Sequence, residues 1–68
     1  MANTIRINGT AEPLAARTVA ELVAERSETQ GRGIAVALNG AVVRRAAWAA
    51  TPLKPGDVVE IVRAMQGG

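Results

Sequence analysis

The chain has 68 residues, of which 49% are hydrophobic and 21% are charged, and its formal net charge is +2. This length allows one domain with a single core. Cysteine and histidine are absent, which excludes disulfides, thiolate metal sites and the usual general base near neutral pH. The basic residues are dispersed, and aromatic residues are almost absent. Because nucleic-acid-binding domains cluster basic side chains and add aromatic ones, we do not expect a nucleic-acid partner.

The N-terminal residues carry no charged leader followed by an apolar run, so we expect no signal peptide. The longest nearly apolar stretch, residues 34–43, is interrupted by Asn39-Gly40 and is too short to span a bilayer. We therefore expect a cytoplasmic protein that does not interact with membranes.

Residues 4–8 alternate polar and apolar side chains, which is typical of a half-buried strand. Asn8-Gly9 follows and predicts a tight hairpin, because both residues tolerate positive φ. The return strand runs from Thr10 to about Leu14. Pro13 predicts that this strand lies at a sheet edge, since proline cannot donate a ladder hydrogen bond.

Thr18 and Glu21 have the spacing of a capping box, which predicts a helix from Val19 to about Glu28. An apolar stripe on this helix predicts the face that packs on the sheet; it consists of Val19, Leu22 and Val23.

Residues 34–38 have a strand pattern, Asn39-Gly40 repeats the tight-turn signal, and residues 41–44 form the partner strand. The segment 45–51 is mixed and is predicted to be an irregular crossing. Its single large apolar side chain, Trp48, is expected in the core or at its margin.

Residues 54–57, Lys-Pro-Gly-Asp, suit a type II turn. The final strand is predicted at 58–64, with Val59 and Ile61 in the core and Val58 and Val62 on the opposite face.

This order of elements predicts an α+β protein in which one main helix crosses a mixed four- to five-stranded sheet. The first and last strands are expected to be central and parallel, which is the β-grasp (ubiquitin-like) arrangement. A ferredoxin-like fold needs a second helix, and residues 45–53 are too short for one. We predict a domain at 1–64 and a flexible tail at 65–68.

The tail is the candidate for chemistry. Glycine has no Cβ, so Gly67-Gly68 can pass through a narrow channel into the active site of a partner. This suits activation of the α-carboxylate of Gly68. Adenylation turns that carboxylate into a mixed anhydride, and a sulfur nucleophile then displaces AMP and leaves a thiocarboxylate. Gly67, Gln66 and Met65 are the predicted approach to the reacting group.

Three residues of the last strand are predicted to contact a partner protein. Val58 and Val62 lie on the face away from the helix, where they are interpreted as an apolar docking patch. Arg63 is interpreted as a contact for an acidic partner surface.

The chain resembles the ThiS family of sulfur carriers in thiamine biosynthesis. The matching segments are Ile5-x-Ile7-Asn8-Gly9, Thr18-Val19-x-Glu21-Leu22, residues 34–43, Arg45-x-x-Trp48, Leu53-x-x-Gly56-Asp57-x-Val59-Glu60-Ile61-Val62 and Gly67-Gly68. Arg44 departs from the pattern, since the family often has proline at this position.

The resemblance implies that the chain is a protein cosubstrate and not an enzyme. An E1-like adenylyltransferase (ThiF-like) would use ATP and magnesium to adenylate Gly68, so this chain would bind no cofactor itself. A cysteine-derived persulfide would supply sulfur, and a thiazole synthase (ThiG-like) would receive it.

Three alternatives stay open at this point. The chain also resembles the small subunit of molybdopterin synthase, although those chains tend to be longer. A ubiquitin-like modifier joined to target lysines through Gly68 has the same tail. A purely structural binding module would not need Gly67 and Gly68 at all.

Overall fold

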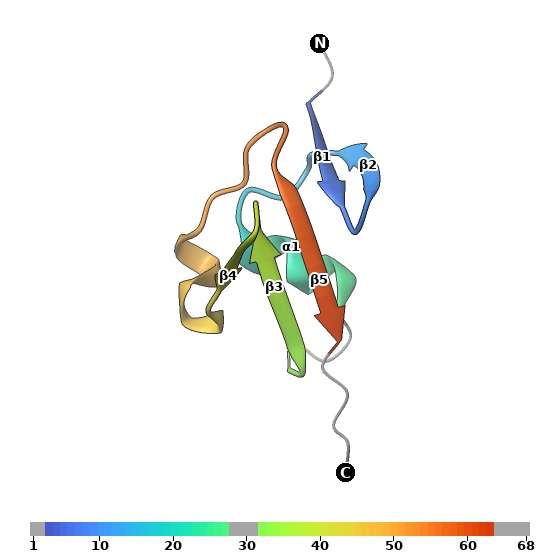
Figure 1. Ribbon diagram of the computed structural model, residues 1–68. Coiled ribbons are helices and arrows are strands. Elements are labelled where there is room, and N and C mark those ends of the chain that lie inside the picture. The colour runs from blue at the N-terminus through green and yellow to red at the C-terminus, as the bar shows by residue number, and fades with distance from the viewer. Residues whose placement is uncertain (1–2, 28–31, 64–68) are drawn as a thin grey trace.

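A computed structural model describes residues 3–27 and 32–63, and Figure 1 shows its arrangement. Its elements are β1 (Thr4–Ile7), β2 (Thr10–Pro13), α1 (Val19–Arg26), β3 (Ile34–Leu38), β4 (Ala41–Val43), the 3-10 helix η1 (Arg45–Ala50) and β5 (Val58–Arg63). The strands form one five-stranded sheet in the order β2-β1-β5-β3-β4. Helix α1 lies across one face of that sheet and leaves the other face open (Figure 1).

The predicted β-grasp topology is confirmed by the strand pairing. β1 and β5 are parallel and adjacent near the middle of the sheet, and β5 is antiparallel to β3 on its other side. Each outer strand is the second arm of a hairpin with a central neighbour. β2, with Pro13 at its end, occupies an edge as predicted.

Both predicted hairpin turns are present. Asn8 and Asn39 each have φ of 51°, and the glycines that follow them have φ of 84° and 86°. Positive φ at both central residues is the geometry of a type I′ turn, which matches the twist of the flanking strands. The type II turn at 54–57 also forms, with φ of 88° at Gly56 and a hydrogen bond from the Asp57 N–H to the Lys54 carbonyl.

Helix α1 begins as predicted and ends earlier. The Thr18 hydroxyl accepts from the Glu21 N–H at 3.2 Å, and the Glu21 carboxylate accepts from the Arg17 N–H at 2.8 Å. The helix was expected to continue to about Glu28, but Ser27 already has the extended conformation of a C-cap. Serine hydrogen-bonds readily in non-helical conformations, which favours a helix end at this residue.

The last turn of α1 is joined to edge strand β2 by an ion pair between Arg26 and Glu12. The hydrogen bond from Arg26 to Glu12 raises the pKa of the guanidinium above its ordinary value, although partial burial opposes this. Both groups are partly exposed, so the pair contributes little to the free energy of unfolding.

The core lies between α1 and the sheet. The three valines Val19, Val36 and Val59 are almost completely buried, and they come from the helix and the two central antiparallel strands. The full set of buried apolar residues is Ile5, Ile7, Ala16, Val19, Leu22, Val23, Val36, Trp48, Leu53 and Val59.

The segment predicted to be irregular is a six-residue 3-10 helix, η1. Four of these six residues are alanine, a strong helix former, and Pro52 follows shortly after the end. Trp48 is buried, and its indole N–H donates to the Val43 carbonyl at 2.9 Å. The expectation that Trp48 belongs to the core is therefore confirmed.

Candidate functional site

The four predicted tail residues, Met65, Gln66, Gly67 and Gly68, lie outside the described residues, as does Ala64. The candidate site that the structure describes is therefore β5, the strand that precedes them, together with the open face of the sheet. What β5 can do depends on how firmly it is held and on which side chains it exposes.

Strand β5 is fixed along both edges. Its register with β3 extends from the pair Leu38–Val59 to the pair Ile34–Arg63. On the other edge, β1 is paired in parallel at Arg6–Val58 and Ile7–Val59. β5 therefore reaches Arg63 as a central strand of the sheet.

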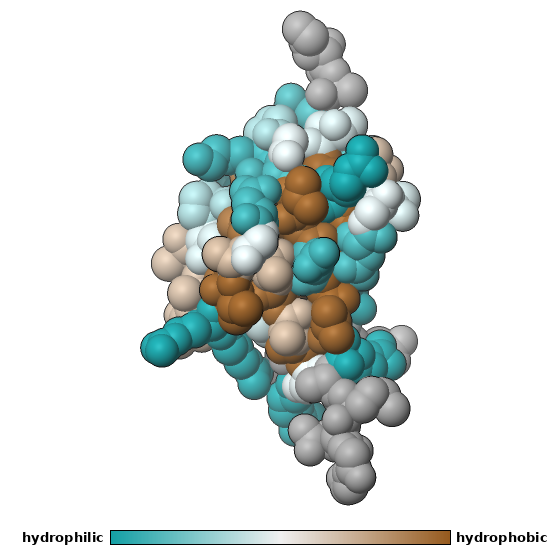
Figure 2. Space-filling model, viewed as in Figure 1, coloured by the Kyte–Doolittle hydropathy of each residue, from teal (hydrophilic) through white to brown (hydrophobic). Residues whose placement is uncertain are grey.

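The open face presents aliphatic side chains with little above them. Val42, Val58 and Val62 are 80%, 41% and 58% exposed. The register places Ala35 beside Val62 and Ala37 beside Val42, so small residues lie between the valines. Figure 2 views this side of the molecule and shows hydrophobic atoms gathered over the centre of the sheet. We call this set of five residues the valine face.

Two charged residues of the same face lie among these aliphatic groups or beside them. Glu60 lies between Val58 and Val62 on β5 and is opposite Ala37 in the register. Arg6 on β1 is paired with Val58. The resulting surface is an apolar area with one acidic and one basic group within it, a composition found at protein–protein contacts.

Arg63 does not belong to the valine face. Its register partner is Ile34, and directly opposed residues of an antiparallel pair share one side of the sheet. Arg63 therefore has the orientation of Val59 and Ile61, towards the helix side, although it is exposed. Side chains alternate between the two faces along a strand, so the sequence positions of Val59, Ile61 and Arg63 already predict that they share one side of the sheet.

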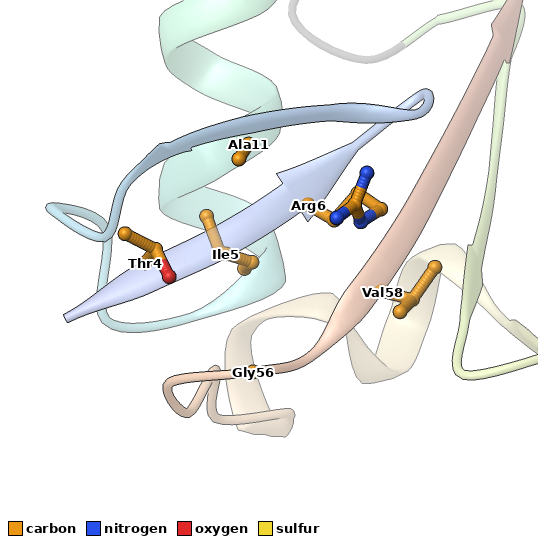
Figure 3. Close-up of a pocket in the computed structure, with 6 residues that line it drawn as sticks. All are labelled: Thr4, Ile5, Arg6, Ala11, Gly56 and Val58. Atoms are coloured by element: carbon orange, nitrogen blue, oxygen red, sulfur yellow. The ribbon is translucent and has the colours of Figure 1, made fainter. Parts of the chain in front are cut away.

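A shallow pocket of about 150 Å³ opens where β1 meets the start of β5. Figure 3 shows the side chains of Arg6 and Val58 on these adjacent strands, both near the opening. The Arg6 guanidinium donates to the Gly9 carbonyl at 3.1 Å. The lining residues are Thr4, Ile5, Arg6, Ala11, Gly56 and Val58. No sequence motif indicated this pocket, because it arises from the pairing of the first and last strands.

Arg44, which stands where the family often has proline, has φ of −64° and ψ of 145°. This is the φ that a proline ring imposes. The backbone therefore retains a proline-like conformation at the entry to η1 without the ring.

Within residues 3–27 and 32–63, no cluster of three or more metal-ligating side chains is present. Over the same residues, α1 is far too short and polar to be a membrane-crossing helix.

The sequence model of the ThiS family matches residues 2–68. The sulfur carrier protein ThiS of Thermus thermophilus is 39% identical over 62 residues, which cover 91% of this chain and 95% of that protein. A crystal structure of the thiamine biosynthesis protein ThiS from Geobacter metallireducens is also similar. Its TM-score is 0.78 at 35% identity, with 96% of this chain and 99% of that chain covered.

A solution structure of a thiamine biosynthesis protein from Geobacter metallireducens is similar too. Its TM-score is 0.76 at 34% identity, and the match covers 96% of this chain and 87% of that one. The family match extends over nearly the whole sequence, and the structural matches contain the same sheet and helix. From these similarities, the chain belongs to the ThiS family.

Proposed function

We propose that this chain carries sulfur for thiamine biosynthesis as a thiocarboxylate on Gly68. The supporting observation is the family match, which continues through Gly68, five positions after the end of a strand that is held centrally in the sheet. The curated relative is a sulfur carrier by name, and both solved relatives are thiamine biosynthesis proteins.

The proposed chemistry takes place at the Gly68 carbonyl carbon. A carboxylate is a poor electrophile, so it must first be activated. In the active site of a partner adenylyltransferase, the Gly68 carboxylate attacks ATP, which forms the acyl adenylate and releases pyrophosphate. The outer sulfur of a persulfide donor then displaces AMP and forms an acyl disulfide with Gly68. A second thiol cleaves the S–S bond of this adduct, which leaves the thiocarboxylate on Gly68 and a disulfide on the donor side. ATP and magnesium belong to the partner in this scheme. This chain acts as a protein cosubstrate, and a thiazole synthase is the proposed acceptor of the sulfur.

The valine face is the proposed docking surface for the adenylyltransferase. Val58 and Val62 are 41% and 58% exposed, and they belong to the last strand before Gly67 and Gly68. Covering this face would remove apolar area from water, at roughly 25 cal/mol per Å². Docking here would also bring Gly68 within reach of the same enzyme, since Gly68 is five positions from Arg63 in the sequence.

The test is intact-mass analysis after incubation with ATP, magnesium, the adenylyltransferase and a sulfur donor. The expected product has one oxygen replaced by sulfur at the C-terminal carboxylate. A variant that lacks Gly67 and Gly68 is the control and should remain unmodified. If the full chain also stays unmodified with an enzyme that is active on another carrier, the proposal is wrong. Copurification of a thiazole synthase would distinguish this function from those of the molybdopterin synthase subunit and the protein modifier.

A further inference from the structure

The two Asn-Gly turns share one backbone geometry, yet their asparagine side chains hold different halves of β5. Asn8 and Asn39 have the same φ of 51°, and both are exposed. Neither carboxamide is needed to form the turn, because asparagine and glycine differ little at such positions. The contacts of the two carboxamides are therefore a property of these side chains that the turns do not require.

The Asn8 carboxamide acts as one additional peptide unit of β1. Its Oδ1 accepts from the Ile61 N–H at 2.8 Å, and its Nδ2 donates to the Ile61 carbonyl at 3.2 Å. The Asn8 backbone N–H donates to the Val59 carbonyl at 2.9 Å. Main chain and side chain of one residue thus continue the β1–β5 ladder beyond Ile7, where β1 itself ends.

This contact lies on the edge of β5 that β1 leaves uncovered. The β1–β5 register ends at Val59, whereas β3 follows β5 on the other edge as far as Arg63. Among the described residues, Asn8 provides the side-chain hydrogen bonds to β5 between Val59 and Arg63 on the β1 side. The orientation of β5 up to Arg63 depends on both edges being held.

Asn39 binds the beginning of the same strand. Its Oδ1 accepts from the Val58 N–H at 2.9 Å, and its Nδ2 donates to the Asp57 carboxylate at 3.1 Å. The other oxygen of that carboxylate accepts from the Lys54 N–H at 2.8 Å. Asn39 therefore closes the turn that leads into β5, at the end remote from Gly68.

We propose that Asn8 is a positioning residue for the sulfur-carrier reaction, because it fixes the carboxyl-terminal half of β5 and so directs the following segment towards the active site of the partner. This inference rests on the proposed function. Asn8 touches none of the reacting atoms. It acts through Ile61, and a small misdirection of a reacting group can lower a rate strongly.

The experiment compares Asn8→Gly with Asn39→Gly. Glycine keeps the positive φ in each turn and removes only the carboxamide. Amide hydrogen exchange is measured first. Asn8→Gly should speed exchange at Ile61 by about fivefold or more, and Asn39→Gly should do the same at Val58, because each variant removes the acceptor of that amide.

Adenylation kinetics are measured next, with the full chain and the adenylyltransferase. Asn8→Gly should lower kcat by roughly threefold to tenfold and leave KM for the carrier nearly constant, because the valine face is unchanged. Asn39→Gly should stay within about twofold of the wild-type chain. Asn8→Asp keeps an acceptor for the Ile61 N–H and loses the donor, so its rate should lie between that of wild type and that of Asn8→Gly.

Three results would overturn the positioning role alone. The first is an unchanged exchange rate at Ile61 in Asn8→Gly. The second is equal slowing of adenylation by Asn8→Gly and Asn39→Gly, which indicates a general loss of stability. The third is normal adenylation of the wild-type chain that is insensitive to Asn8→Gly. If the wild-type chain is not adenylated at all, the proposed function has failed and the positioning role fails with it.

Discussion

Strand β5 carries valines on both faces of the sheet, and their surroundings differ completely. Val59 is fully buried against α1, whereas Val58 and Val62 are 41% and 58% exposed. Burial of a valine contributes roughly 1.5–3 kcal/mol to folding, but an exposed valine contributes little of this. The same residue type therefore has a stability role on one face. On the other face it is available for contact with a partner.

The largest effect is expected when a charge is placed on the buried face. Val59→Asp puts a carboxylate among apolar side chains without a partner, which costs about 5 kcal/mol or more and equals most of the stability of a small domain. We expect the variant to be unfolded by circular dichroism and NMR. A folded Val59→Asp chain would show that the two faces differ less than their burial indicates.

The same substitution on the open face should leave the fold intact. Val62→Asp is expected to change the free energy of unfolding by less than about 1 kcal/mol, because the side chain is already in solvent. Adenylation should slow by roughly tenfold, since a carboxylate would have to be desolvated at the docking surface.

Ala24→Asp is the matched control for Val62→Asp. It adds one carboxylate at an exposed position of α1, on the other side of the sheet. Stability of both variants is measured by urea denaturation, and their rates by steady-state kinetics. Equal rates for Val62→Asp and wild type would remove the valine face from the proposed interface.

A substitution at Trp48 tests how much the stability of the core depends on one hydrogen bond. Trp48→Phe removes the hydrogen bond to the Val43 carbonyl and leaves a ring in the core. We expect a loss of about 1–3 kcal/mol, which combines the unpaired carbonyl with the smaller ring. Because the chain has no other aromatic residue, the denaturation is followed by circular dichroism. No loss of stability would mean that this hydrogen bond is not important for packing.

The smallest effect concerns Arg44, which joins β4 to η1. Its φ of −64° already suits proline, so Arg44→Pro should raise the free energy of unfolding by about 0.4–1 kcal/mol through the unfolded state. Urea denaturation measures this, with Arg44→Ala as the control for loss of the charge. A destabilised Arg44→Pro chain would indicate that the Arg44 N–H is needed in the folded protein.

Sequence patterns predicted those parts of the fold that depend on local chemistry. The two hairpins, the N-cap at Thr18 and the turn at 54–57 each follow from residues within four positions of one another. Alternation also separated Val59 from Val58 and Val62 correctly. The central parallel pair of strands followed from the order of the elements.

The features that were missed depend on distant residues or on weak periodicity. The sequence of η1 is mostly alanine, with Trp48 as its single large apolar residue. It therefore has no apolar pattern that separates a short helix from a loop. The pocket near Arg6 and the carboxamide contacts of Asn8 join residues about fifty positions apart. No local propensity encodes such contacts, because they exist only once the sheet has formed.

The central position of β5 has a consequence for synthesis on the ribosome. The hairpins β1–β2 and β3–β4 contact each other in the sheet only through β5, and isolated two-stranded hairpins are marginal in water. The sheet therefore cannot assemble until residues 58–63 have left the exit tunnel, which happens well after they have been translated. A chain interrupted before residue 58 lacks the strand that joins the two hairpins, so it presents no complete valine face.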